Sequence, residues 1–188
     1  MAGKKNISIY ISQLLRHKPE EIGLKMDEHG WVSVDELICG INKAGKYRID
    51  REKLEEIVSR DSKGRFQFNE NYCMIKACQG HTISWVEPEM EYMEPPAFLY
   101  HGTTMTAAEK IMSSGEISKM KRHDVHMQAD IEKAWQSAMR WHLAPVVLKI
   151  DAGKMYRLGF IFGKTENNVW CTDHVPVEFI VEKIQKMT

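Results

Sequence analysis

Apolar residues recur every three or four positions near the start of the chain, and this spacing predicts a helix from Asn6 to Lys18. Its apolar face consists of Ile7, Tyr10, Ile11, Leu14 and Leu15. Pro19 ends the helix, because a proline disfavours the helical conformation in the residue before it. Arg16 and His17 therefore fall in the final helical turn.

Two more helices are predicted from their caps as well as from their periodicity. Ser33, with Glu36 three residues later, forms a capping box for a helix from Val34 to about Lys43. Asp50 caps a helix from Arg51 to Ser59. Two short extended pieces, residues 23–26 and 30–33, precede them.

The spacing of apolar residues then changes from every three or four positions to every second position, which predicts a β-hairpin. Residues 65–68 alternate like a strand, residues 72–78 supply its partner, and residues 69–71 form the turn. Three helices followed by a two-stranded wing is the order of a winged-helix unit. That fold often meets nucleic acid, but a fold alone does not decide a function.

Residues 86–97 differ in character from both flanks, with four glutamates, three prolines and little apolar periodicity. Pro95 and Pro96 can continue neither a helix nor a central strand. We therefore expect a linker over residues 86–97 between a domain of residues 1–85 and a domain of residues 98–188. The alternative is that this segment lies flat along the second domain.

The second half mixes short strands with helices, so the predicted fold class is α+β. Gly115 ends a helix from about Thr106 to Ser113, and Asp130 caps a later one. The expected strands are residues 98–103, 125–127, 145–151, 167–172 and 179–181.

Composition narrows the possible partners. The 26 Lys and Arg balance the 26 Asp and Glu, and each half of the chain is balanced separately. A protein that grips long nucleic acid non-specifically usually has a net basic field, so contact here would need a local cluster at a particular phosphate. No apolar run approaches a membrane span or follows the basic start of the chain, which predicts a cytoplasmic protein. No heptad pattern indicates a dimer, so a monomer is expected.

The sequence lacks the motifs of several kinds of catalytic, nucleotide-binding and metal site. There is no GxGxxG, no phosphate-binding P-loop, no HExxH and no GxSxG. The four cysteines contain no CxxC pair, which argues for ordinary thiols and against a zinc site. What remains is a set of basic residues in turns and at element ends, where functional side chains concentrate. They are Arg16, His17, Arg65, His101, Arg122 and His126.

Arg16 and His17 suit a phosphate dianion. A guanidinium can hold a phosphate with two parallel hydrogen bonds, and a neighbouring imidazole can donate or shuttle a proton. The alternative is that cations at a helix C-terminus only complement the macrodipole and stay in water.

Eight motifs in one order bear on this choice. They are Leu15–Pro19, Gly30–Val32, Lys63–Phe66, Gln79–Thr82, Leu99–Thr103, Arg122 with Val125–His126, Val147–Leu148 with Asp151–Ala152, and Asn167 with Val169–Asp173. Together they resemble the NAD-dependent RNA 2'-phosphotransferase family, over about residues 6–182.

The resemblance implies a winged-helix-like N-terminal lobe and an ADP-ribosyltransferase-like C-terminal lobe, with the site in the cleft between them. It implies transfer of an internal RNA 2'-phosphate, as left at a tRNA splice junction, to NAD as co-substrate. The products would be 2'-hydroxyl RNA, nicotinamide and ADP-ribose cyclic phosphate. The family's catalytic set matches Arg16, His17, Arg65 and Arg122. Its NAD-contacting residues match His101, Gly102, Thr103 and His126, and no metal is implied.

One position departs from the family pattern, which often has Arg-x-His-Val-His where this chain has Asp124 in place of the first histidine. An acid there would repel phosphate unless it faces Arg122 or a ribose hydroxyl. We interpret Glu166 as a surface residue and Trp170 as a core residue. His81 reads as a loop histidine without a task.

Two alternative functions stay open. One is an ADP-ribosyltransferase that caps terminal nucleic-acid phosphates and stops after the first step. The other is a non-catalytic module that binds RNA or NAD.

Overall fold

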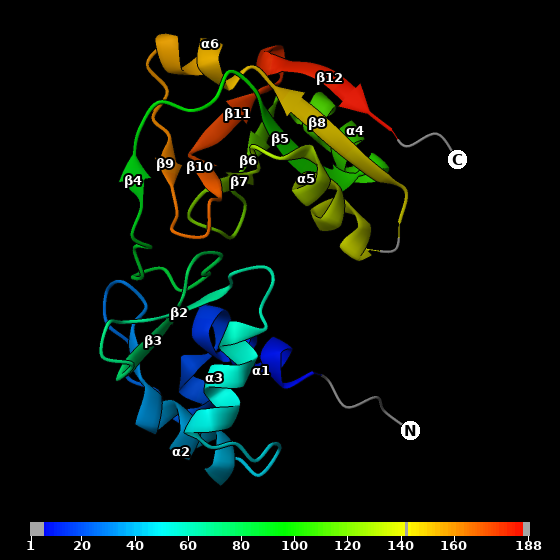
Figure 1. Cartoon of the computed structure of the whole chain (residues 1–188). Coiled ribbons are helices and arrows are strands. Elements are labelled where there is room, and N and C mark those ends of the chain that lie inside the picture. The colour runs from blue at the N-terminus through cyan, green and yellow to red at the C-terminus, as the bar shows by residue number, and fades with distance from the viewer. Residues whose placement is uncertain (1–5, 142, 186–188) are drawn as a thin grey trace. The chain divides into compact units, whose positions relative to one another are not determined.

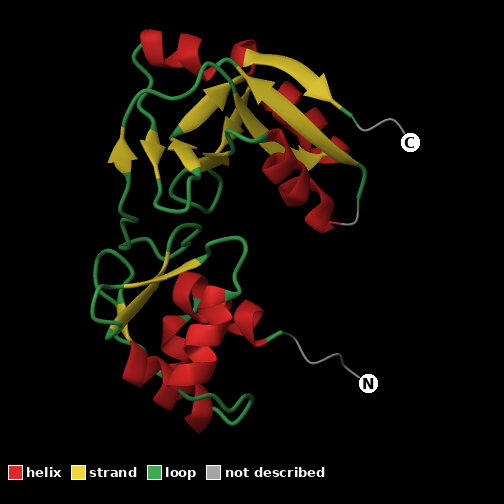
Figure 2. Cartoon of the chain, viewed as in Figure 1, coloured by secondary structure: helices red, strands yellow, loops and turns green. Residues whose placement is uncertain are grey.

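The computed structural model describes residues 6–141 and 143–185 and has an α+β fold (Figures 1 and 2). The chain divides into two compact units, Met1–Glu89 and Met90–Thr188. The basic residues at the very start of the sequence lie outside the described part. Among the described helices, none combines the length and apolarity needed to cross a membrane.

The first unit contains three helices and a small sheet. The helices are α1 (Ile7–His17), α2 (Val34–Lys43) and α3 (Arg51–Ser59), with a 3-10 turn η1 (Pro19–Ile22) after α1. The strands are β1 (Val32–Ser33), β2 (Phe66–Phe68) and β3 (Met74–Ala77), in the antiparallel order β1-β3-β2.

Caps and apolar faces explain the three helices. The side chains of Asn6, Ser33 and Asp50 each accept a hydrogen bond from a backbone N–H of the first turn. The predicted apolar face of α1 lies in the core of this unit, with Leu14 and Leu15 fully buried. These helices therefore form where the periodicity predicted them, and α1 ends with its two basic residues beside Pro19.

The hairpin is shorter than predicted. Pairing covers only Phe66–Phe68 against Ile75–Ala77, because Asn69 accepts the backbone N–H of Met74 and closes the turn early. The strand β1, which the sequence indicated only as an extended piece, pairs with the other edge of β3.

The second unit contains three helices and short strands. The helices are α4 (Met105–Ser114), α5 (Ile131–Ala138) and α6 (Ala152–Arg157), with 3-10 turns η2 (Met139–Trp141) and η3 (Val177–Phe179). The sheet β4-β9-β10-β7 has strands Glu91–Tyr92, Gly163–Lys164, Trp170–Thr172 and Val125–Met127. The sheet β12-β8-β5 has strands Ile180–Ile184, Pro145–Ile150 and Leu99–Thr104, and β11 (His174–Pro176) pairs with β6 (Glu116–Ser118).

Strand β8 is apolar apart from Lys149, because both of its faces are covered. Val147 packs with Ala134, Trp135 and Ala138 of α5, which lies across β8 in Figure 1. Val146 and Leu148 point to the opposite side and join the larger core of the unit. A strand buried on both faces loses its polar alternation, which is why this segment gave the clearest strand signal.

The segment predicted as a linker is divided between the two units. Val86 is fully buried, and the backbone N–H of Glu87 donates to the carbonyl of Glu28. Beyond Glu89, strand β4 pairs with β9 of the second unit. Helix α6 and strands β4, β6, β9 and β11 had no clear signal in the sequence.

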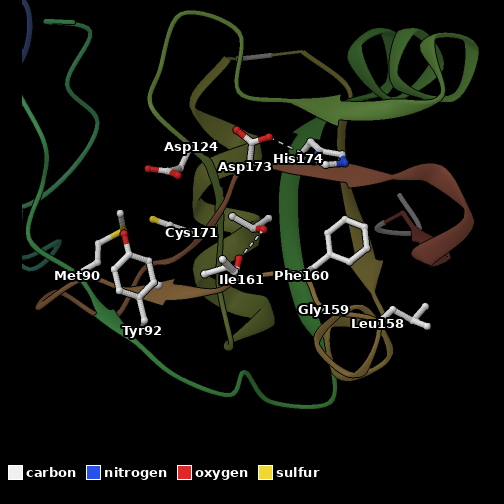
Figure 3. Close-up of a pocket in the computed structure, with 12 residues that line it drawn as sticks. Met90, Tyr92, Asp124, Leu158, Gly159, Phe160, Ile161, Cys171, Asp173 and His174 are labelled. Carbon is white, nitrogen blue, oxygen red and sulfur yellow. Dashed lines mark hydrogen bonds and ion pairs between the residues drawn. The ribbon is translucent and has the colours of Figure 1, made fainter. Parts of the chain in front are cut away.

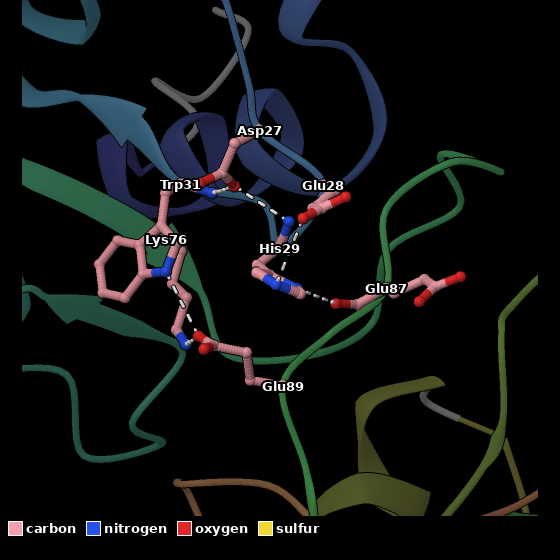
Figure 4. A network of polar contacts seen from close by, with 7 residues as sticks. All are labelled: Asp27, Glu28, His29, Trp31, Lys76, Glu87 and Glu89. Carbon is pink, nitrogen blue, oxygen red and sulfur yellow. Dashed lines mark hydrogen bonds and ion pairs between the residues drawn. The ribbon is translucent and has the colours of Figure 1, made fainter.

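A polar network holds the last residues of the first unit to its sheet (Figure 4). The ammonium group of Lys76 lies 4.5 Å from the ring centre of Trp31 and forms an ion pair with Glu89. Trp31 Nε1 donates to the same carboxylate at 3.3 Å. The Lys76 side chain is only 3% exposed, so the charge of Glu89 offsets the cost of burying an ammonium.

Replacing Glu89→Gln removes that charge, and we expect the free energy of unfolding to fall by about 1–2 kcal/mol at neutral pH. The hydrogen bond from Lys76 lowers the pKa of Glu89, so its contribution is present above the ordinary value of 4.5 and is lost as pH falls through the lower folded-state pKa. Urea unfolding of both proteins between pH 7 and pH 3 measures the difference, which should shrink toward acid. Glu70→Gln, at an exposed turn position, is the matched control. An equal effect from both variants would contradict the role of the ion pair.

Candidate active site

The last turn of α1 is covered by a returning segment of the chain, residues 78–82. The backbone N–H of Thr82 donates to the carbonyl of Arg16 at 3.0 Å, and a 3.0 Å hydrogen bond joins Thr82 Oγ1 to His17 Nδ1. Gly80 has a φ of +88° and packs beside Arg16, since a Cβ built on it would lie 3.7 Å from the guanidinium carbon. Arg16 and His17 are therefore held by one loop at one helix end.

Arg65 is oriented by a buried carboxylate. Asp61, whose side chain is 3% exposed, accepts from Arg65 Nε at 3.0 Å and from the Arg65 backbone N–H. Arg65 Nη2 donates to the hydroxyl of Ser8 on α1 at 2.6 Å. One edge of the guanidinium is thus fixed at the start of β2 and joined to the helix that carries Arg16 and His17.

His101 lies on β5 in the second unit and is half-buried. Its Nδ1 lies 2.9 Å from the carbonyl oxygen of His126, and a carbonyl can only accept, so Nδ1 carries the proton. Burial lowers the pKa of His101 and the nearby Arg122 acts in the same direction, against the hydrogen bond to His126. The ring is therefore neutral at pH 7, and its Nε2 has a lone pair that can accept a hydrogen bond.

Gly102 and Thr103 follow His101 on the same strand. A Cβ on Gly102 would lie 2.0 Å from the carbonyl oxygen of Ala134, so glycine is required for α5 to pack against β5. Thr103 is buried and pairs with Val146 of β8. The close packing of α5 is thus sufficient to explain why position 102 is a glycine, independently of any contact with a ligand.

Arg122 and Asp124 precede β7, and the two side chains have different surroundings. Asp124 lines a pocket together with Asp173 and the buried thiol of Cys171 (Figure 3). Desolvation raises the pKa of Asp124, and the charge of Asp173 adds to the rise, while His123 and Lys119 oppose it. Among the described residues, no ion pair joins Asp124 to Arg122.

This pocket has a volume of about 720 Å³ and lies within the second unit. Tyr92, Gly163, Cys171 and His126 are successive partners across the strands of one sheet, and so share one face of it. Gly163 lets Met90 pack closely against the sheet, because a Cβ there would lie 3.0 Å from the sulfur of Met90. Two carboxylates and an apolar floor make this pocket unsuited to a phosphate.

Several predicted details can be compared with the structure. Trp170 is buried and Glu166 is exposed, as predicted, and all four cysteines are free thiols. His81 lies in a loop, as predicted, but the residue is only 1% exposed and its ring packs against Gly30, which the sequence did not indicate. Among the described residues, no group of three or more His, Cys, Asp or Glu side chains is arranged to hold a metal ion.

Sequence reasoning missed the residues that hold the predicted cations, namely Ser8, Asp61 and Thr82. Asp61 had a usable signal, since it precedes Arg65 by four residues across the turn containing Gly64. Ser8 had none, and the Gln79–Thr82 motif gave no sign that Thr82 contacts His17, because the partners of Ser8 and Thr82 lie 57 and 65 residues away in the sequence.

Comparison with known proteins now bears on this geometry. Residues 3–174 match the model of a family described as RNA 2'-phosphotransferase, Tpt1 / KptA family. The chain belongs to this family.

Relatives in the family cover nearly the whole chain. Proteins of Fusobacterium nucleatum and Flavobacterium johnsoniae, each named "Probable RNA 2'-phosphotransferase", are both 46% identical to it. The alignments span 91% and 94% of this chain and 94% of each relative. Protein CC0527 of Caulobacter crescentus, a solved structure, covers 47% of this chain and 84% of its own at 14% identity, and its TM-score of 0.37 is too low to bear on the fold.

The family's His-Gly-Thr motif offers a direct test of the His101 geometry. In nitrogen-15 spectra of histidine-labelled protein, we expect His101 to show a neutral ring with Nδ1 protonated at pH 6.5. Because its pKa is lowered on folding, the unfolded state binds a proton first and stability falls as pH drops below about 6.5. The same protein in urea is the control, where the signal should titrate near 6.5. A ring protonated on Nε2 alone would contradict the assignment.

Proposed function

We propose that this protein removes an internal 2'-phosphate from RNA by transferring it to NAD. The family match over residues 3–174 supports the reaction, and the arrangement around α1 supports the residues. The three helices and the β2–β3 hairpin are consistent with a winged-helix-like RNA lobe. The second unit would be the ADP-ribosyltransferase-like lobe that binds NAD.

The observation that carries the proposal is the placement of cations along one side of α1. Ser8, Ser12 and Arg16 follow one another at intervals of four residues and so form one stripe of the helix. Arg65 is bonded to Ser8 at one end of this stripe, and Arg16 occupies the other end. Helical side chains lean toward the N-terminus, so we expect the Arg16 side chain to extend toward Ser12 and Arg65.

Arg65 keeps donors for a ligand in this arrangement. A guanidinium has five N–H groups, and the bonds to Asp61 and Ser8 use those on Nε and Nη2. Nη1 supplies the donors we assign to the phosphate. A guanidinium already fixed by a buried carboxylate loses little entropy on binding, which is the condition for electrostatic stabilisation without reorganisation.

The chemistry has two steps. First, an oxygen of the RNA 2'-phosphate attacks the anomeric carbon of the nicotinamide ribose, and nicotinamide leaves with the electrons of the broken C–N bond. Then a neighbouring ribose hydroxyl attacks the phosphorus, the bond to the RNA 2'-oxygen breaks, and the cyclic phosphate of ADP-ribose forms. We assign the offsetting of negative charge on the phosphoryl oxygens to Arg16 and Arg65 of the first unit, and the resemblance adds Arg122 to this set as a prediction. We assign to the His17 imidazole the passage of a proton from the attacking ribose hydroxyl to the departing 2'-oxygen.

His101 fits a role toward NAD. With Nδ1 bound to the His126 carbonyl, a neutral ring presents Nε2 as an acceptor, which suits a ribose hydroxyl. A protonated His101 ring would be repelled by the nearby Arg122. The lowered pKa of His101 keeps the ring neutral, and this repulsion is avoided. We assign Gly102, Thr103 and His126 to the same binding region.

The direct experiment is incubation with NAD and a short RNA bearing one internal 2'-phosphate. We expect 2'-hydroxyl RNA, nicotinamide and ADP-ribose cyclic phosphate in equal amounts. RNA without the 2'-phosphate is the control. Accumulation of ADP-ribosylated RNA would instead indicate an enzyme that stops after the first step, and binding without any product would indicate a non-catalytic module.

Arg65→Lys keeps a positive charge near Asp61 but removes the planar fork. We expect kcat/KM for the 2'-phosphorylated RNA to fall about 100-fold, as for loss of one fixed donor to a developing charge. Arg60→Lys is the matched control, because Arg60 is 80% exposed and pairs only with Glu56 among the described side chains. Unchanged phosphate transfer by Arg65→Lys would refute the assignment.

A further inference from the structure

The segment from Cys78 to Thr82 connects two of the cationic residues through its backbone. The N–H of Cys78 donates to the carbonyl of Arg65 at 2.9 Å, and the N–H of Thr82 donates to the carbonyl of Arg16 at 3.0 Å. The segment therefore spans from the start of β2 to the end of α1. Its side chains can act on both.

Two contacts fix this segment in place. His81 is buried, and its ring occupies the space beside Gly30, where a Cβ would lie 2.9 Å from His81 Nε2. Gly80 adopts a positive φ that other residues rarely take, and this lets the backbone pass beside the Arg16 guanidinium. Thr82 follows His81 directly, and its backbone N–H bonds the carbonyl of Arg16, so the backbone that carries its hydroxyl is fixed although the side chain is exposed.

The Thr82 hydroxyl then meets His17. Thr82 Oγ1 lies 3.0 Å from His17 Nδ1, across 65 residues of sequence. Threonine is β-branched and stiff about χ1, so its hydroxyl is held with little loss of entropy. A partner on one ring nitrogen fixes the orientation of an imidazole and decides which nitrogen faces the substrate.

We propose that Thr82 is a positioning residue for the 2'-phosphate reaction, which orients His17 so that its Nε2 meets the substrate. The inference rests on the proposed function for its effect on the rate, but the contact between Thr82 and His17 can be tested without any activity. Thr82 itself touches neither RNA nor NAD. Its hydroxyl acts through the imidazole, in the second step, where the RNA 2'-oxygen leaves and takes up a proton.

Two substitutions separate the hydroxyl from the packing. Thr82→Val keeps the branched shape and removes the hydrogen bond, whereas Thr82→Ser keeps the hydroxyl and removes the methyl group. Thr106→Val, at an exposed position of α4, is the matched control. All three variants are made in the full chain, and their thermal unfolding is recorded first.

Single-turnover assays with NAD and 2'-phosphorylated RNA measure the two steps separately. We expect Thr82→Val to slow release of 2'-hydroxyl RNA about 10- to 100-fold, as for other partners that orient a reacting side chain. Formation of nicotinamide and the KM for NAD should stay within about twofold of the parent protein, and Thr82→Ser should restore release to within about threefold. Equal rates for Thr82→Val and the parent, or equal losses for Thr82→Val and Thr82→Ser, would overturn the inference.

Nitrogen-15 spectra of the His17 ring provide the second readout. We expect the ratio of Nδ1-protonated to Nε2-protonated ring to change in Thr82→Val and to stay as in the parent in Thr82→Ser. If the parent transfers no phosphate but the ratio changes, the proposed function fails while the positioning of His17 stands. If the ratio is the same in all variants, the positioning is wrong whatever the activity.

Discussion

The candidate site depends on a helix end that carries positive charge and is nevertheless held rigidly. The apolar face of α1 is buried, which fixes the axis of the helix, and the chain returns 65 residues later to bond its last turn. Cations at a helix C-terminus are favourable because of the macrodipole, so the charge itself costs little there. What the fold adds is orientation. A guanidinium or imidazole that is already fixed can stabilise charge at the moment it develops, without first losing side-chain entropy.

Arg65 is also held in a fixed orientation, but by different contacts. Asp61 binds one edge of the guanidinium from a nearly solvent-free position, and Ser8 joins that edge to α1. A carboxylate so close reduces the net charge of the pair, so Arg65 serves less as a long-range attractor than as a directed donor. Paired, hydrogen-bonded arrangements are also the form in which a buried carboxylate is tolerated. Arg65 and the residues that hold it therefore form one interdependent set.

The second unit differs in its electrostatics around His101 and the pocket. His101 is kept neutral by burial, and the pocket beside β10 gathers two carboxylates and a thiol whose pKa is raised by desolvation. Asp124 faces this pocket, with Lys119 and Asp173 nearby, and so adds negative charge to the cavity. Among the described residues, no ion pair links Asp124 to Arg122.

The sequence alone determined the features that depend on neighbours within a few positions. The three N-terminal helices follow from periodicity and caps, Gly115 ends α4 in the left-handed conformation, and β8 follows from its apolar run. The basic residues of the site could be named because a motif is a local pattern. Tertiary structure decided what depends on distant neighbours: that Gly102 makes room for α5, that β4 joins a sheet, and that Thr82 reaches His17. A single chain records no pairing between positions so far apart, because those contacts arise only when packing brings the segments together.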